Sequence, residues 1–212
     1  MNNAKKVFIV DTNNMYERMF TARGWEITRD LLAADLVQFT GGADVSPYLY
    51  GEERHATTYN DPRRDLVEAG YYQVCLLIGK PMAGICRGGQ FLNVMNGGKL
   101  YQNVNSHAIG GTHDATLFYR RDFMDNTHTF QVTSTHHQMM RVGEKGQLLL
   151  TASEATQLET DHLTFMGKGE DVEAAWYAES RSLCYQPHPE IVGKEHDCQE
   201  LYFHLLNNYI GV

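Results

Sequence analysis

The most informative stretch covers residues 80–95, which have the sequence KPMAGICRGGQFLNVM. Its first half is apolar and has the length of a buried strand, and its second half has the apolar spacing of a helix. Between the two halves stands Cys86, with Gly84, Gly88 and Gly89 around it. The stretch therefore predicts a strand, a tight turn at the cysteine and a helix.

A cysteine at such a turn occupies the position that serine has in the nucleophile elbow of G-x-S-x-G hydrolases. Small neighbouring residues allow the turn to tighten and a substrate to approach the backbone. The N-terminus of the following helix favours a thiolate over a thiol. A buried structural cysteine is the alternative, because free cysteines are among the most buried residues. Cys86 is thus a candidate nucleophile that needs a base and oxyanion donors.

Composition bounds the class of protein. The chain has 212 residues, 42% hydrophobic and 21% charged, which predicts a single folded domain over residues 1–212. A formal charge of −8 argues against a broad surface for nucleic acid or an anionic membrane. The apolar run that ends at Asp11 is too short for a signal peptide. Four separated cysteines with no C-x-x-C pair favour a cytoplasmic protein with reduced thiols.

The first half of the chain alternates between strand and helix patterns. Strands are predicted over residues 6–11 and 36–40, and helices over residues 12–23 and from Asp61 onward. This alternation predicts an α/β fold with a mostly parallel central sheet covered by helices on both faces. One face of the helix after Asp61 carries the apolar positions Leu66, Gly70, Val74, Leu77 and Ile78.

The second half is richer in strand patterns. Extra strands are predicted over residues 115–119, 130–133, 148–151, 172–176 and 183–186. A final helix is predicted over residues 194–208, with an apolar stripe formed by Cys198, Leu201, Tyr202 and Leu205.

His188 is the histidine best placed to act as the base for Cys86. It stands in YQPHPE, residues 185–190, directly after a predicted strand, and sites on parallel sheets collect at strand ends. Glu190 is near enough in sequence to accept a hydrogen bond from the ring and fix its tautomer, provided that the chain turns at Pro189. A stiff, proline-rich surface loop is the alternative.

Two backbone segments are candidates for an oxyanion hole. Arg87 offers the N–H beside the nucleophile, and the segment TGGAD at residues 40–44 offers a second N–H from a neighbouring strand end. A glycine pair is weak evidence alone, because many strands end in glycine.

Taken together, these features resemble a known family. The resemblance rests on TGGADVSP at residues 40–47, RDLVE at 64–68, GICRGGQFLNV at 84–94, and STHHQ at 134–138 with YQPHPE at 185–190. In these blocks and their order, the chain resembles class I glutamine amidotransferase-like hydrolases, and within them the γ-glutamyl-γ-aminobutyrate hydrolase group of peptidase family C26. The blocks span residues 40 to 190, which is most of the chain.

The resemblance implies a flavodoxin-like three-layer fold and a Cys-His-Glu triad. Position by position, it makes Cys86 the nucleophile, His188 the general base and acid, and Glu190 the orienting carboxylate. It assigns the oxyanion donors to Gly42 and Arg87, and it implies no metal or organic cofactor. It also gives a role in binding substrate or shaping its pocket to Gln90, His136, His137 and Gln138.

The chain departs from the family in three places. Residues 12–35 form a shorter lead-in than the family usually has, and Pro187 stands where related sequences often carry tryptophan. The segment between Gln102 and Ser134 matches only loosely. It carries His107, His113 and His128, whose spacing fits no metal-ligand pattern, so we expect polar loop residues there.

Three functions are compatible with the sequence. The leading one is a cysteine hydrolase that cleaves γ-glutamyl amides through a γ-glutamyl thioester. The alternative is a glutaminase subunit that delivers ammonia from glutamine to a separate synthetase or ligase partner. A third is an inactive binding or regulatory module, whose mark would be a lost triad residue, and all three triad residues are present. The sequence does not name the amine leaving group or decide between a monomer and a homodimer.

Overall fold

The computed structural model describes residues 4–11, 13–104, 107–117, 129–153, 158–159, 164–165 and 171–212. Within these residues the main sheet has nine strands in the order β2-β1-β3-β4-β13-β12-β9-β6-β7. The pairings from β2 to β13 are parallel, and those from β13 to β7 are antiparallel. The sheet is therefore mixed, with a parallel half and an antiparallel half that meet at β13.

The parallel half is built from β1 (Lys6–Val10), β2 (Glu26–Ile27), β3 (Leu36–Phe39), β4 (Met82–Ile85) and β13 (Ser182–Tyr185). The antiparallel half is built from β6 (Gly111–Leu117), β7 (Thr129–Ser134), β9 (Gln147–Ala152) and β12 (Val172–Tyr177). Two small pairs stand beside it, β5 (Lys99–Tyr101) with β8 (Met139–Arg141), and β10 (Leu158–Glu159) with β11 (Thr164–Phe165).

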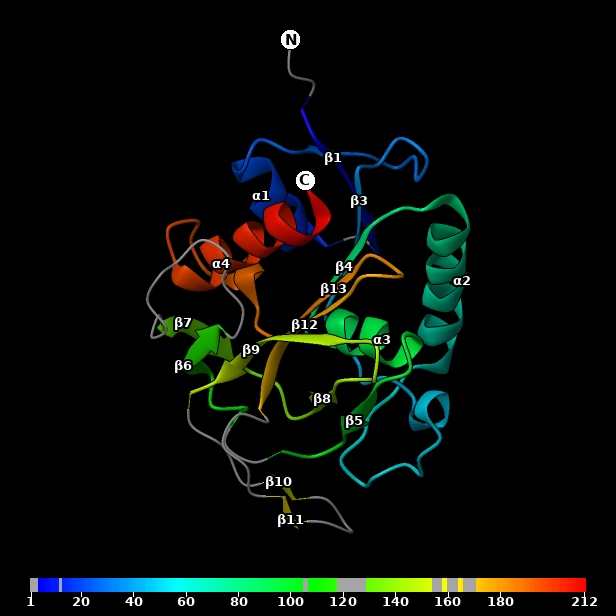
Figure 1. The fold of residues 1–212 in the computed structure, drawn as a ribbon, viewed down its shortest axis with the longest axis vertical. Helices are drawn as coiled ribbons and strands as arrows, with labels where there is room; N and C mark the ends of the chain where they lie inside the picture. The colour runs from blue at the N-terminus through cyan, green and yellow to red at the C-terminus, as the bar shows by residue number, and fades with distance from the viewer. Residues whose placement is uncertain are drawn as a thin grey trace.

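Helices cover both faces of the sheet (Figure 1). One layer contains α1 (Asn14–Ala22) and α4 (Asp197–Leu205), and the other contains α2 (Pro62–Ile78) and α3 (Arg87–Met95). Shorter turns complete the chain: the 3₁₀ helices η1 (Pro47–Tyr50) and η2 (Pro189–Ile191), and the π-helical turn η3 (Leu206–Ile210). None of the helices in the described ranges is both long and apolar enough to cross a membrane.

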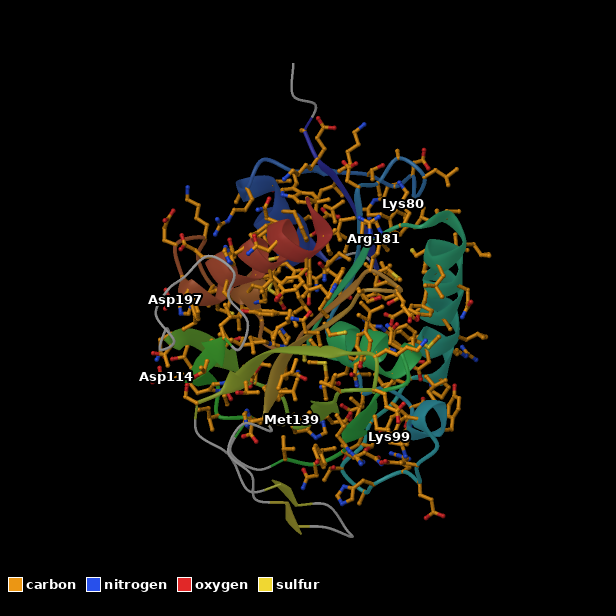
Figure 2. All side chains as sticks on the ribbon, viewed as in Figure 1. Lys80, Lys99, Asp114, Met139, Arg181 and Asp197 are labelled. Carbon is orange, nitrogen blue, oxygen red and sulfur yellow. The ribbon has the colours of Figure 1, made fainter. Side chains whose placement is uncertain are left out.

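Side chains fill the space between the sheet and both helix layers (Figure 2). In β1, Val7 and Ile9 pack toward α1 and α4, whereas Phe8 and Val10 pack toward α2 and α3. A strand that is buried on both faces needs apolar residues at every position, which explains the continuous apolar runs of the parallel strands. The predicted α/β class, the mostly parallel first half and the added strands of the second half are confirmed.

The predicted packing face of α2 is wrong. Leu66 and Leu77, which belong to the predicted apolar face, are 76% and 85% exposed. The helix instead buries a face formed by Asp65, Glu68, Tyr72 and Cys75. The two acids face inward because a buried arginine from α3 lies opposite them, and a buried charge needs a partner of opposite sign.

Candidate active site

Cys86 occupies the predicted elbow between β4 and α3. Its backbone has φ 51° and ψ −116°, and it is the residue that precedes the first turn of α3. A side chain at Gly84 would overlap the backbone of Gly88, and a Cβ at Gly88 would lie 2.5 Å from the carbonyl oxygen of Phe39. The strand and the helix can approach this closely only because both positions are glycine. A non-glycine residue at positive φ is a strained conformation of the kind that clusters at active sites.

His188 and Glu190 form the predicted pair. The chain turns at η2 directly after His188, and His188 Nδ1 lies 2.6 Å from Glu190 Oε1. The backbone N–H of His188 donates to Thr133 Oγ1 at 2.6 Å, which anchors the turn to β7. The proline-flanked segment is thus fixed in place, with the Glu190 carboxylate buried against the ring.

The imidazole of His188 lies beside Cys86. A Cβ placed on Gly41 would be 3.1 Å from His188 Cε1 and 3.7 Å from Cys86 Cβ, so the three residues converge. Burial alone lowers the pKa of His188, but its interaction with Cys86 and its bond to Glu190 raise it to about 11. A raised imidazole pKa favours the imidazolium form, which is the partner that a reactive thiolate requires.

The glycine loop after β3 lies beside Cys86, and the side chain of Arg64 holds it through hydrogen bonds to its backbone. Arg64 donates to the carbonyl oxygens of Gly41 and Thr40 at 3.0 and 2.9 Å. Gly42 has φ 142°, and a side chain there would overlap the guanidinium of Arg64. A residue other than glycine would therefore be strained at position 42 and would also displace the arginine.

The side chain of Arg87 is buried, with 1% of its surface exposed. Its guanidinium pairs with Asp65 at 2.5 Å and with Glu68, and its Nε donates to the carbonyl oxygen of Ala43 at 3.1 Å. Burial and the neighbouring Arg64 lower the pKa of Arg87 to about 10, against the pull of Asp65, so it stays charged at neutral pH. We call Arg64, Asp65, Glu68 and Arg87 the arginine cluster.

A cavity of about 230 Å³ opens over the elbow. Its lining includes Cys86, both predicted oxyanion residues and all four predicted binding residues, together with Ala43, Asp44, Tyr59 and Thr135. Pockets that place a few polar groups around a reactive residue are the usual form of small-molecule sites. The structure therefore brings Cys86, the predicted oxyanion residues and the predicted binding residues together around one cavity, whose lining does not include His188 or Glu190.

The four predicted binding residues differ in what they offer to a ligand. The amide of Gln90 donates to the Gln138 carbonyl and to the Gln186 side chain, both at 3.1 Å, so it supports the wall of the pocket. Gln138 is also buried, and its amide donates to Thr58 Oγ1 at 3.3 Å. The ring of His136 is buried and faces away from solvent into the antiparallel half.

His137 is the partly exposed member of the four. Its Nε2 lies 3.1 Å from Asp44 Oδ1, and this hydrogen bond raises the pKa of His137 against the effect of burial. The other oxygen of Asp44 accepts from the backbone N–H of Tyr59 at 2.8 Å. A carboxylate and an imidazole thus face the cavity together.

The chain shows a clear similarity to known proteins. The peptidase C26 family model matches residues 23–167. Over 199 residues the chain is 31% identical to the glutamine amidotransferase-like protein YvdE of Lactococcus lactis subsp. lactis, a match that covers 84% of this chain and 75% of that protein. The chain belongs to the peptidase C26 family. It is thus a glutamine amidotransferase-like hydrolase, as the sequence blocks predicted, and His188 and Glu190 lie beyond the residues that the family model matches.

Solved structures share the C26 chain's fold at low sequence identity. A structure described as a GMP synthase subunit from Thermoplasma acidophilum aligns with a TM-score of 0.65 and 16% identity, covering 100% of this chain and 94% of its own. A glutamine amidotransferase from Thermotoga maritima aligns with a TM-score of 0.63 and 17% identity, covering 97% of this chain and 85% of its own. At this identity the matches establish the fold alone.

Two groups at this C26 site were not predicted from the sequence. Tyr16, on α1, accepts a hydrogen bond from the Gly41 N–H at 2.9 Å, and burial together with the nearby Glu190 carboxylate raises its pKa, so it lies between the glycine loop and that carboxylate. Nothing in the pattern of residues 12–23 distinguishes this tyrosine from an ordinary core residue. Asp44 stands inside the TGGAD segment, and its polar character next to the glycines was the available signal.

Of the histidines between Gln102 and Ser134, the expectation of polar loop residues is wrong for His113, whereas His107 does lie in a loop, before β6. His107 is buried, with 1% of its surface exposed, and His113 lies within β6 rather than in a loop. The two rings pack edge to face, with centroids 5.2 Å apart, and contact Asp171, just before β12, and Glu173, on β12. His128 lies outside the described residues.

Proposed function

We propose that this C26 protein hydrolyses γ-glutamyl amides through a γ-glutamyl thioester on Cys86. One observation carries the proposal: the 2.6 Å His188–Glu190 pair stands beside a cysteine held in an elbow. A nucleophile, a base that contacts it and a third group that orients the base form the arrangement that covalent acyl transfer needs.

Acylation begins when the Cys86 thiolate attacks the carbonyl carbon of the amide and forms a C–S bond. The backbone N–H groups of Gly42 and Arg87 stabilise the oxyanion that develops. The imidazolium of His188 then gives its proton to the leaving nitrogen, the C–N bond breaks and the amine departs.

Deacylation uses the same groups in reverse. The neutral imidazole of His188 removes a proton from water while the water oxygen attacks the thioester carbonyl. The C–S bond breaks, glutamate is released, and the thiolate and imidazolium are restored. Glu190 holds the ring in place through both steps and stabilises its charged form.

The pocket matches the charges of a γ-glutamyl group. Its α-ammonium can pair with the Asp44 carboxylate, and its α-carboxylate can pair with the protonated ring of His137. These two side chains contact each other at 3.1 Å and line the same cavity as Cys86. Asp44→Asn and His137→Gln should therefore raise KM for a γ-glutamyl substrate more than they lower kcat.

The test is hydrolysis of a substrate panel by the pure full chain: γ-glutamyl-γ-aminobutyrate, γ-glutamyl-putrescine, γ-glutamyl amino acids and glutamine. We expect amine or ammonia release from at least one member, and loss of that activity in Cys86→Ala. Cys75→Ala is the matched control, because Cys75 is buried in the opposite layer and should leave the rate unchanged. Equal rates for wild type and Cys86→Ala across the panel would overturn the proposal.

A glutaminase subunit is the second candidate. It is favoured by the fold shared with the GMP synthase structure from Thermoplasma acidophilum, and by the exposed apolar positions on α2, which a partner synthetase or a homodimer could cover. This function predicts weak activity on glutamine alone and strong stimulation by a synthetase or ligase. The free-standing hydrolase instead predicts full activity on a γ-glutamyl amine without any added protein.

A further inference from the structure

A second group of ionisable side chains lies in the antiparallel half, behind the wall of the pocket. It consists of His107 before β6, His113 on β6, His136 after β7, and Asp171 and Glu173 at the start of β12, and we call it the histidine cluster. His107, His136, Asp171 and Glu173 are each at most 3% exposed. The mechanism above uses none of these side chains.

Three imidazole rings converge on a single carboxylate oxygen. Glu173 Oε1 lies 3.0 Å from His113 Nε2, 3.7 Å from His107 Nδ1 and 3.8 Å from His136 Nε2. Around a tetrahedral zinc ion with N and O ligands at about 2.0–2.1 Å, neighbouring ligand atoms are about 3.3–3.4 Å apart. The observed separations bracket this value, and the ligand atoms of His107, His113 and Glu173 all lie within 4.8 Å of one another.

The atoms that face this centre lack hydrogen bonds within the described part of the chain. They are His107 Nδ1, His113 Nε2, both ring nitrogens of His136 and both carboxylate oxygens of Glu173. His113 Nε2 and Glu173 Oε1 face each other at 3.0 Å, the shortest of the three ring contacts to this oxygen. Buried polar atoms are nearly always bonded, so this concentration of unsatisfied nitrogen and oxygen atoms indicates a missing partner common to all of them.

The outer contacts of the cluster also suit a metal. His107 Nε2 lies 3.0 Å from Asp171 Oδ2, which places the ring proton on Nε2 and leaves the Nδ1 lone pair facing Glu173. A carboxylate behind a ligating histidine is the usual support for a bound metal.

We propose that the histidine cluster binds one divalent transition-metal ion of the zinc class. His107 Nδ1, His113 Nε2 and Glu173 Oε1 are the core ligands. His136 Nε2 lies 3.8 Å from Glu173 Oε1 but outside this group of mutually close atoms, and it becomes the fourth ligand by a shift of its ring on metal binding. Three imidazoles and one carboxylate suit zinc better than the all-oxygen shells of Mg²⁺ or Ca²⁺. A site whose four positions are all filled by protein is structural rather than catalytic.

The ion would stabilise two segments beside the catalytic centre, the one that contains His136 and the strand end that precedes His188. His136 belongs to the segment that lines the cavity beside Cys86. The carbonyl oxygen of Glu173 accepts from the Gln186 N–H at 2.8 Å, two residues before His188. Metal binding therefore stabilises the pocket wall and the strand end that carries the base, whatever substrate the enzyme uses.

The test is zinc binding by the full chain after treatment with a chelator, measured by calorimetry and by metal analysis of the dialysed protein. We expect one zinc per chain, a higher Tm with zinc, and a tetrahedral absorption spectrum with cobalt that lacks thiolate charge transfer. Asp171→Asn should lower zinc affinity about 10–100-fold, and Glu173→Gln should lower it at least as much. His204→Asn, on α4, is the matched histidine control and should bind as wild type does.

Cys86→Ala distinguishes this site from zinc held by the catalytic thiol and imidazole. The proposal is supported if Cys86→Ala keeps the zinc and Glu173→Gln loses it. It is overturned if wild type shows neither stoichiometric zinc nor a zinc-dependent Tm. It is also overturned if the zinc is lost from Cys86→Ala but kept by Glu173→Gln. Should a cluster variant fail to fold, the cobalt spectrum of the wild type decides, because thiolate charge transfer would assign the metal to Cys86.

Discussion

Two buried charged clusters flank the pocket, and they are satisfied in different ways. In the arginine cluster two cations meet two carboxylates, with Arg64–Glu68 at 2.8 Å and Arg87–Asp65 at 2.5 Å. In the histidine cluster three rings meet one carboxylate oxygen, and the facing atoms have no hydrogen bonds in the described residues. The first cluster carries its own counter-charges, whereas the second has the composition of a ligand shell.

The difference matters because each cluster holds one side of the same site. The arginine cluster donates hydrogen bonds to the backbone of the glycine loop beside Cys86. The histidine cluster holds the segment from Thr135 to Gln138 and the strand end before His188. Substitutions in the two clusters should therefore affect stability in distinguishable ways.

The largest effect is expected for Arg87→Met. This change leaves Asp65 and Glu68 buried near Arg64 alone, and removing one partner of a buried ion pair costs about 3–5 kcal/mol. Urea unfolding should show this loss with and without chelator, because the arginine cluster needs no metal. The control is Arg63→Met at an exposed position of α2, the helix that carries Asp65 and Glu68, and it should stay within about 0.5 kcal/mol of wild type. An Arg87→Met protein as stable as the control would show that the cluster is not what holds the loop.

Gly42→Ala should have a smaller effect on stability and a clear effect on rate. The residue has φ 142°, and a side chain would displace Arg64, so we expect a cost of about 1–3 kcal/mol. The displaced loop should also lower kcat, because the Gly42 N–H no longer points at the oxyanion. Gly51→Ala tests the backbone strain alone, since it also has positive φ but no atom lies within 4 Å of the added Cβ. Equal kcat values for Gly42→Ala and Gly51→Ala would show that the glycine loop does not contribute to catalysis.

His188, the proposed base, belongs to neither cluster. The pH dependence of stability and activity tests its pairing with Glu190. The pKa of His188 is raised to about 11, so its protonated form persists well above the ordinary imidazole value of about 6.5. The imidazolium therefore stabilises the folded state fully below about pH 6.5, and this contribution is lost as pH rises toward 11. Activity should fall on the alkaline side only as that pKa is approached, and Glu190→Gln should move the fall to lower pH. An alkaline limb that Glu190→Gln does not shift would contradict the His188–Glu190 assignment.

The smallest effect is expected at the surface of α2. Leu77 is 85% exposed, so Leu77→Ser should change the free energy of unfolding by less than about 0.5 kcal/mol. Cys75, two residues earlier, is fully buried, and Cys75→Ser should cost about 1–3 kcal/mol because it buries a hydroxyl group. Chemical denaturation of the two variants compares the faces directly. If Leu77→Ser lost more free energy of unfolding than Cys75→Ser, the packing face predicted from the sequence would be right after all.

These comparisons also show where sequence analysis succeeds and fails. The inner strands of the parallel half were predictable, because a strand buried on both sides leaves an uninterrupted apolar run such as Val7 to Val10, whereas the two-residue edge strand β2 was not predicted. The elbow at Cys86 was predictable because glycines are needed where β4 and α3 touch. Both signals are local, so a single sequence displays them.

The clusters could not be predicted, because their members come from distant segments. Asp65 and Glu68 look like solvent-facing acids until α2 packs on Arg87, and their burial reverses the apparent inner face of the helix. His107, His136 and Glu173 are separated by tens of residues, so no ligand spacing appears in the sequence. Only the antiparallel pairing of β6, β9 and β12 brings that second cluster together.

The central claim is that Cys86 is the nucleophile that carries the glutamyl group. The most direct measurement is mass spectrometry of the full chain after reaction with a glutamine-like electrophile at neutral pH, followed by peptide mapping. Burial raises the pKa of Cys75 and of Cys198 to about 11, so those thiols stay protonated and unreactive. We predict one adduct per chain, located on Cys86 and absent from His188→Ala. Labelling at Cys75, Cys184 or Cys198 instead, or equal labelling in His188→Ala, would contradict the account.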